Sequence, residues 1–154
     1  MASVKRKPHK RPVSAASDAR HGIYPADWPM EWKLLQANRH YEIMCDSVEL
    51  INKTVYPQTF FYRYREALRQ AKIIIGLCGQ HRLGILAAQT EKALITNRTL
   101  ITNRFLDRCA AAGKLAIVEA ELLAFCSEMP TECMVHLREL LAGLTAAEIP
   151  ERPI

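Results

Sequence analysis

The sequence predicts an all-α protein, built as a four- or five-helix, mostly antiparallel bundle with a flexible basic N-terminal tail. The first observation is composition, because the 154 residues include only six Gly while the helix formers Ala, Leu, Glu, Lys and Arg are common. The second is periodicity, because apolar residues recur at alternating spacings of three and four, the repeat of one helix face. Hydrophobic residues make up 49%, which is enough for one continuous core.

The first helix is expected over about residues 28–55, where Asp27 suits the N-cap and Pro29 is tolerated in the first turn. The apolar stripe of this helix is the strongest periodic signal in the chain and consists of Leu34, Ala37, Tyr41, Met44, Val48, Ile51 and Val55. Such a heptad stripe suits packing against another helix of the same chain, and it equally suits the seam of a homodimer.

Pro57 breaks this helix, because proline lacks an amide hydrogen and pushes Tyr56 towards extended geometry. A second helix is expected over about residues 60–78. The same three-and-four spacing recurs there at Phe61, Tyr64, Leu68, Ala71, Ile75 and Cys78. Two amphipathic helices joined by a short loop are expected to fold back as an antiparallel hairpin.

A third helical stretch is expected over about residues 85–112, after a loop indicated by Gly76, Gly79 and Gly84. This stretch holds a tandem hexapeptide that begins at Leu94 and again at Leu100. Thr, Ile and Asn weaken helix propensity in the hexapeptide and allow a break near residues 97–102.

The last part of the chain is expected to form two more helices. Gly113 separates a helix over residues 115–129 from the preceding stretch, and Pro130 starts a final helix with Gly143 just beyond its end. The bundle is therefore expected over residues 23–145. A basic disordered tail at 1–22 precedes it and a loose C-terminal tail at 146–154 follows it.

The sequence around the first predicted hairpin turn resembles a pattern found in a group of bacterial proteins. Residues 52–64 read N-K-T-V-Y-P-Q-T-F-F-Y-R-Y, which resembles the N-x-T-x-x-P-x-T-F-F-x-R-Y pattern of small uncharacterised helical proteins of Gram-positive bacteria and their mobile elements. Residues 105–108, F-L-D-R, resemble a second segment of that group. The resemblance covers about a third of the chain. It implies a helical hairpin and a bacterial or phage setting, and it supplies no site.

The net charge of +5 is concentrated in the tail, because residues 1–22 hold six basic side chains and one acidic side chain while the rest is balanced. The candidate nucleic-acid or partner-binding residues of the tail are Lys5, Arg6, Lys7, Lys10 and Arg11. The tail has no apolar segment after its basic residues, so a secretory signal is not expected. No apolar run is long enough to span a membrane, and a cytoplasmic location is expected.

The middle of the chain is basic as well. Residues 62–108 hold nine basic and three acidic side chains, whereas the residues beyond are acidic overall. Candidate partner- or phosphate-binding residues in this stretch are Arg63, Arg69, Arg98, Arg104 and Arg108. The alternative is a solvated helix surface paired with acidic neighbours, and the sequence favours that alternative.

Two Cys-x-x-His pairs, Cys78 with His81 and Cys133 with His136, have the spacing of one helix face. Together they would supply the four ligands of a tetrahedral zinc site. The alternative is that the cysteines are small core side chains, and it is favoured because both segments already read as amphipathic helices. Neither a metal nor another cofactor is therefore expected.

No pattern typical of an enzyme occurs, so a non-catalytic protein is expected. Trp28, Trp32 and Leu35 either cover the end of the bundle, which is favoured, or form an aromatic patch for a partner. The expected function is an interaction protein of a bacterium, phage or mobile element, such as an inhibitor or adaptor that docks on a protein or nucleoprotein complex. The first alternative is direct DNA or RNA binding through the tail and the Arg-rich side, and the second is a zinc-stabilised domain.

Overall fold

The computed structural model describes the backbone of residues 22–148 and the side chains of residues 22–144. Six α-helices, one 3-10 helix and no strand occur within that range, which confirms the all-α prediction. The elements are α3 (Met30–Ile51), α4 (Pro57–Cys78), α5 (Arg82–Thr96), α6 (Arg98–Ala111), α7 (Leu115–Leu122), η1 (Leu123–Glu128) and α8 (Thr131–Glu148). Apart from Gly22, the predicted N-terminal tail lies outside the described residues.

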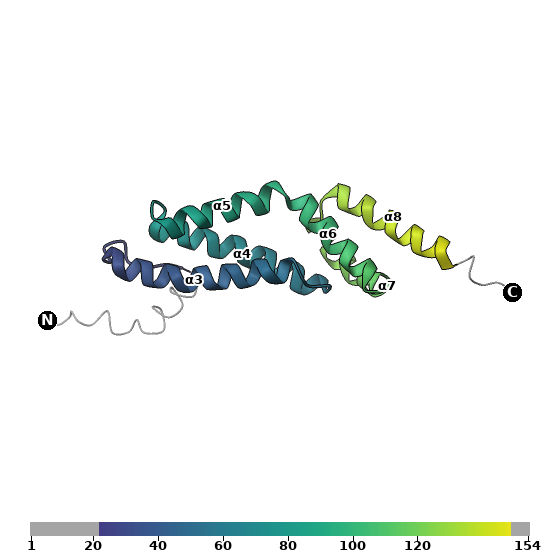
Figure 1. The fold of residues 1–154 in the computed structure, drawn as a ribbon, viewed down its shortest axis with the longest axis horizontal. Helices are drawn as coiled ribbons and strands as arrows, with labels where there is room; N and C mark the ends of the chain where they lie inside the picture. The colour runs from purple at the N-terminus through teal and green to yellow at the C-terminus, as the bar shows by residue number, and fades with distance from the viewer. Residues whose placement is uncertain (1–21, 149–154) are drawn as a thin grey trace.

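The helices are arranged in two groups along an elongated molecule (Figure 1). Helices α3 and α4 form the predicted antiparallel hairpin, and α5 returns along α4. Helices α6, α7 and α8 lie at the other end, where α6 packs on both α7 and α8. No helix among the described residues has the length and apolar character needed to cross a membrane.

The apolar stripes of α3 and α4 pack where periodicity predicted. At the end of the hairpin that holds the α4–α5 turn, Ala37, Met44 and Ile74 form one cluster of buried side chains. The second cluster joins the two groups of helices, and its largest members are Phe60 and Phe105. These two rings stack with their centroids 4.3 Å apart, so α4 and α6 are joined through an aromatic pair.

Three predicted helices differ from the expectation: the first ends earlier, and the other two are divided. Helix α3 ends at Ile51 rather than near Val55. The expected third helix is divided at Asn97, which is the C-cap of α5 and the N-cap of α6. Residues 115–129 form α7 and then a 3-10 helix with a kink at Phe125, whose ring stacks on Phe61 at 5.0 Å.

The prediction for Gly143 was wrong. Helix α8 continues through this glycine to Glu148, past the expected end of the bundle at residue 145. Gly143 does not adopt the positive φ of a helix-terminating glycine, whereas Gly113 does, with φ of 69°. Gly113 thus separates α6 from α7 as predicted.

Candidate functional site

An exposed aromatic patch lies at the start of α3 and consists of Trp28, Trp32 and Leu35. Trp32 is 51% exposed and Leu35 is 65% exposed, while Trp28 is half-buried. The two indole rings meet edge to face with centroids 5.6 Å apart. The favoured prediction that these side chains cover the core was therefore wrong for Trp32 and Leu35.

Tyr24 covers the hairpin in their place. Its ring packs against the cluster that contains Ala37 and Met44 and lies 5.3 Å from the ring of Trp28. The phenol reaches between the helices and contacts His40 Nε2 at 2.8 Å. Tyr24 and Trp28 are thus both half-buried, whereas Trp32 is exposed.

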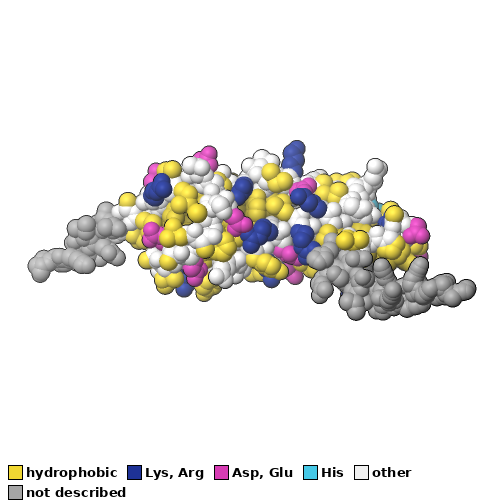
Figure 2. Space-filling view, turned by 180° about the vertical axis from the view of Figure 1, so that it is seen from behind, with side chains coloured by type: hydrophobic (Ala, Val, Ile, Leu, Met, Phe, Trp, Pro, Cys, Tyr) yellow, Lys and Arg dark blue, Asp and Glu magenta, His cyan; other side chains and the backbone are white. Residues whose placement is uncertain are grey.

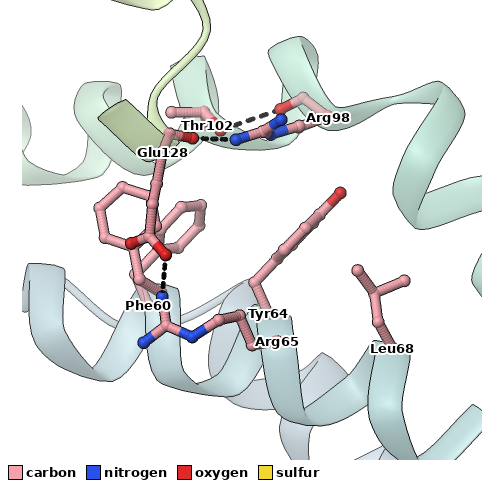
Figure 3. A pocket seen from close by; sticks show the side chains of 8 residues that line it. Phe60, Tyr64, Arg65, Leu68, Arg98, Thr102 and Glu128 are labelled. Atoms are coloured by element: carbon pink, nitrogen blue, oxygen red, sulfur yellow. Dashed lines mark hydrogen bonds and ion pairs between the residues drawn. The ribbon is translucent and has the colours of Figure 1, made fainter. Parts of the chain in front are cut away.

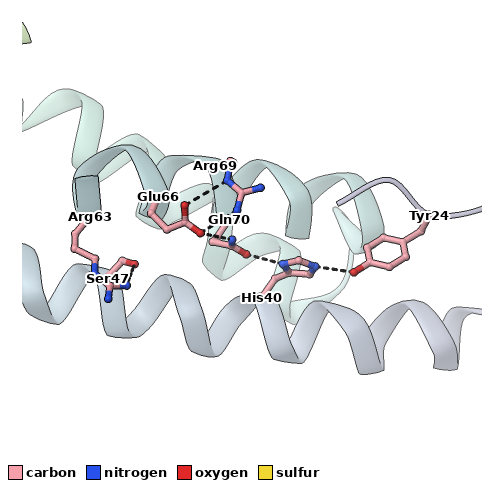
Figure 4. A network of polar contacts seen from close by, with 7 residues as sticks. All are labelled: Tyr24, His40, Ser47, Arg63, Glu66, Arg69 and Gln70. Atoms are coloured by element: carbon pink, nitrogen blue, oxygen red, sulfur yellow. Dashed lines mark hydrogen bonds and ion pairs between the residues drawn. The ribbon is translucent and has the colours of Figure 1, made fainter. Parts of the chain in front are cut away.

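A chain of polar groups fixes Tyr24 in this position (Figure 4). His40 on α3 lies with Nδ1 2.5 Å from Oε1 of Gln70 on α4, and Gln70 Nε2 donates to Glu66 Oε2 at 2.7 Å. Gln70 presents an acceptor to the imidazole, so His40 Nδ1 carries the hydrogen. In the neutral ring Nε2 is then the acceptor. Tyr24 donates its single hydroxyl hydrogen to Nε2 at 2.8 Å in preference to Gln36 Oε1 at 3.4 Å.

Electrostatics favours this arrangement of hydrogens. Burial lowers the pKa of His40, and this effect outweighs the opposing hydrogen bond to Gln70. Burial by itself would raise the pKa of Glu66, but the hydrogen bonds from Arg69 and Gln70 outweigh it and lower that pKa. The neutral imidazole has both nitrogens engaged, so the network orients α3, α4 and the segment around Tyr24.

Sequence reasoning missed this network. Neither His40 nor Gln70 belongs to a motif that the sequence made visible. Both occur at inward positions of apolar stripes, next to Ala37 and Met44 on one helix and beside Ala71 on the other. A polar residue within a buried stripe requires a hydrogen-bond partner, and that signal was present in the sequence.

Most of the predicted arginines are engaged within the protein. Arg63 donates to Ser47 Oγ at 3.3 Å and Arg69 pairs with Glu66 at 3.0 Å. Arg98 and Arg108 donate to main-chain carbonyl oxygens. The exception is Arg104, which is exposed and has no hydrogen bond or ion pair to any residue between 22 and 144.

Figure 2 shows Lys and Arg side chains over the middle of the back face with acidic side chains among them. Basic and acidic side chains are thus interspersed on this face. Of the five predicted arginines, Arg69 has an acidic partner among residues 22–144, namely Glu66. The candidate binding residues of the tail lie outside the described part of the chain: Lys5, Arg6, Lys7, Lys10 and Arg11.

A pocket of about 220 Å³ lies between α4, α6 and η1 (Figure 3). Its apolar floor includes Phe60, Phe61 and Leu68. Arg65 and Glu128 close one side with an ion pair. The second carboxylate oxygen, Oε1 of Glu128, is buried and accepts no hydrogen bond from the described residues. The pocket is small and its polar side chains mostly satisfy one another.

The two Cys-x-x-His pairs do not meet. Cys78 lies in the core cluster near the α4–α5 turn and His81 caps α5, whereas Cys133 and His136 belong to α8 in the other group of helices (Figure 1). The sulfur of Cys133 contacts the carbonyl oxygen of Thr99, and His136 pairs with Asp107 at 2.7 Å. The four-ligand zinc site that required both pairs is therefore not assembled, because the pairs belong to different ends of the fold.

Comparisons with protein-family models, with curated proteins and with solved structures found no match to this chain. The suggested group of small bacterial helical proteins stays a prediction. Its two segments nevertheless meet in the fold, because Arg108 contacts Thr54 and Phe105 stacks on Phe60. Their shared role within this chain is structural.

Proposed function

We propose that this protein is a non-catalytic interaction module that binds another protein through the patch formed by Trp28, Trp32 and Leu35. The observation that carries the proposal is the exposure of Trp32 and Leu35 beside a half-buried Trp28. Tryptophan is enriched among the residues that dominate binding energy in protein interfaces. A contiguous exposed patch of large apolar side chains is typical of a surface that a partner covers.

The support structure of the patch suits such a role. Trp28 lies in ring contact with both Tyr24 and Trp32, and Tyr24 is in turn hydrogen-bonded to His40. The patch is therefore presented by a regular helix and a pinned segment, which reduces the side-chain entropy that binding would cost. A preorganised aromatic surface favours recognition of an apolar side chain or helix on the partner.

Nucleic-acid binding is the weaker candidate for the described part of the chain. Arg63, Arg69, Arg98 and Arg108 already have intramolecular partners, so using them for phosphates would break those contacts. Nucleic-acid binding through the basic N-terminal residues is the alternative function. It predicts binding that weakens steeply with salt and depends on residues 2–12.

The proposal is tested by affinity capture from a bacterial host lysate with matched patch variants. The double variant Trp32→Ser, Leu35→Ser should lose the captured protein, whereas Ile117→Ser, Leu123→Ser, which removes two exposed apolar side chains on α7 and η1, should retain it. Sedimentation of the purified chain reports whether a second copy occupies the patch. Equal capture by both double variants, with a monomer in both cases, would refute the proposal.

A further inference from the structure

A groove of about 550 Å³ lies between the segment that precedes α3 and the outer face of α4. One wall is formed by residues 22–26 and the floor by Ile73, Gly76 and Leu77 of α4. Among the described residues that line it, the charged side chains are Lys33, Arg69 and Lys72, all of them basic, and Glu66 pairs with Arg69 beside it. Its volume is within the usual range for small-molecule sites.

The wall of the groove is held in place. Gly22 has a φ of 77° and approaches α4 so closely that a Cβ atom would overlap the side chain of Ile73. Tyr24 is fixed by its hydrogen bond to His40, and Lys33 Nζ donates to the carbonyl oxygen of Ala26 at 3.0 Å. The groove is thus bounded by packed and hydrogen-bonded elements on both sides.

The cations around it differ in their engagement. Arg69 pairs with Glu66, and Lys33 uses one of its three hydrogens on Ala26. Lys72 is exposed and has no hydrogen bond or ion pair to any residue between 22 and 144. Arg69 is therefore held by a carboxylate, whereas Lys33 and Lys72 retain ammonium hydrogens that no residue between 22 and 144 accepts. These hydrogens favour an anion with several oxygens.

Gly76 leaves part of the floor of the groove without a side chain. It lies inside α4, where glycine is less favourable than alanine, and it does not have a positive φ. A Cβ atom at this position would meet nothing within 4 Å, so packing inside the protein does not require a glycine. Its absent side chain leaves the floor of the groove open for a group that approaches the α4 backbone.

We infer that this groove binds a phosphate ester with an apolar or aromatic body, of the size of a mononucleotide. Lys33 and Lys72 contact the phosphate oxygens while Arg69 keeps its ion pair with Glu66, and the body lies on Gly76 between Ile73 and Leu77. This site is separate from the patch of Trp28, Trp32 and Leu35, and it does not depend on the function proposed for that patch. Binding of phosphate oxygens by lysine and arginine follows ordinary charge-assisted hydrogen bonding.

The experiment is calorimetric titration of the full chain with ATP at low salt, with inorganic triphosphate and a single-stranded oligothymidylate as parallel probes. ATP should bind saturably at one site per chain, and triphosphate should bind about tenfold more weakly because it has no apolar body. Absence of saturable ATP binding overturns the inference. Equal affinity for triphosphate overturns the assigned ligand class, and tighter binding of the oligonucleotide indicates a nucleic-acid surface instead.

Variants locate the site. Lys72→Glu and Gly76→Leu should each weaken ATP binding by about tenfold or more, through charge reversal and through filling of the floor. The matched controls are Lys92→Glu on α5 and Gly143→Leu on α8, which should stay within about twofold of the original affinity. Circular dichroism verifies that each variant is folded. Unchanged binding in both Lys72→Glu and Gly76→Leu would exclude this groove.

Discussion

Arg108 on α6 donates hydrogen bonds to the main-chain carbonyl oxygen of Thr54 through both Nε and Nη2, at 3.2 and 3.1 Å. The same Nη2 also reaches the carbonyl oxygen of Ile51 at 2.7 Å. These carbonyls lie at and just beyond the end of α3, where no following turn of helix supplies amide hydrogens. One side chain from α6 therefore ends α3 and ties the first hairpin to the second group of helices.

Replacing Arg108 with Ala should lower the free energy of unfolding by about 1.5–3 kcal/mol, because charged hydrogen bonds to buried carbonyls are lost. Arg108→Lys should recover only part of this, since an ammonium group cannot reproduce the planar fork of the guanidinium. Urea denaturation gives both values. The control is Arg104→Ala on the same helix, expected within about 0.5 kcal/mol of the original protein. A loss in Arg104→Ala as large as in Arg108→Ala would contradict the assigned role.

The His40 network makes stability depend on pH in one direction. Burial lowers the pKa of folded His40 below the value of about 6.5 expected in the unfolded chain. The unfolded state therefore binds the proton more readily, so stability falls as the pH drops through about 6.5 and levels off below the folded pKa. Urea midpoints measured between about pH 5 and pH 8 should show this decline.

Titration of the imidazole signals by NMR supplies the direct check on His40. Its folded pKa should lie below about 6.5, and His40→Gln should flatten the pH dependence of the urea midpoint around that value. His81, which is exposed at the start of α5, serves as the internal comparison in the same spectra. A folded pKa for His40 at or above the unfolded value would disprove the proposed arrangement of hydrogens.

Two helical glycines should respond oppositely to alanine. A Cβ atom at Gly84 would overlap the main-chain carbonyl of Cys78, so Gly84→Ala forces α5 away from the end of α4 and should cost about 1–3 kcal/mol. A Cβ atom at Gly143 meets nothing within 4 Å, and Gly143→Ala should stabilise the protein by about 0.5–1 kcal/mol. Thermal and urea denaturation measure both changes. Stabilisation by Gly84→Ala would show that the two helices do not approach as described.

The five free cysteines should separate into two classes of reactivity. Cys45 and Cys126 are exposed, whereas Cys78, Cys109 and Cys133 are buried. Burial also raises the pKa of Cys109 to about 11, which leaves little thiolate at neutral pH. Labelling with a thiol-specific disulfide reagent at about pH 8 should modify two cysteines quickly and the other three only after denaturation. Mass spectrometry identifies them, and rapid labelling of Cys109 would contradict the packing.

Much of the fold was predictable because its signals are local. The stripe through Ala37, Met44 and Ile51 predicted which face of α3 is buried, and Pro57 predicted the turn before α4. The exact helix ends were less predictable. The carbonyl oxygen of Ile51, at the end of α3, accepts a hydrogen bond from Arg108. This arginine follows the helix by more than fifty residues in the sequence.

The candidate site was less accessible to sequence reasoning. From the sequence, Trp28, Trp32 and Leu35 were predicted to cover the end of the bundle, because large apolar side chains near a helix start usually pack inward. Tyr24 packs against the core of the hairpin instead, and its phenol is hydrogen-bonded to His40 on α3. For the arginines, the sequence showed where the positive charges are but not which groups of the protein they contact.

The sequence by itself determined the helical class, the hairpin of α3 and α4, and the apolar faces that meet, since each follows from spacings within one helix or turn. Tertiary structure decided which apolar side chains stay outside, which arginines are occupied and where the groove beside Gly76 lies. Those features depend on competition between residues distant in sequence for the same space and the same carbonyl oxygens. The spacing of apolar residues reports on one helix at a time, so it does not predict which distant residues compete for the same space.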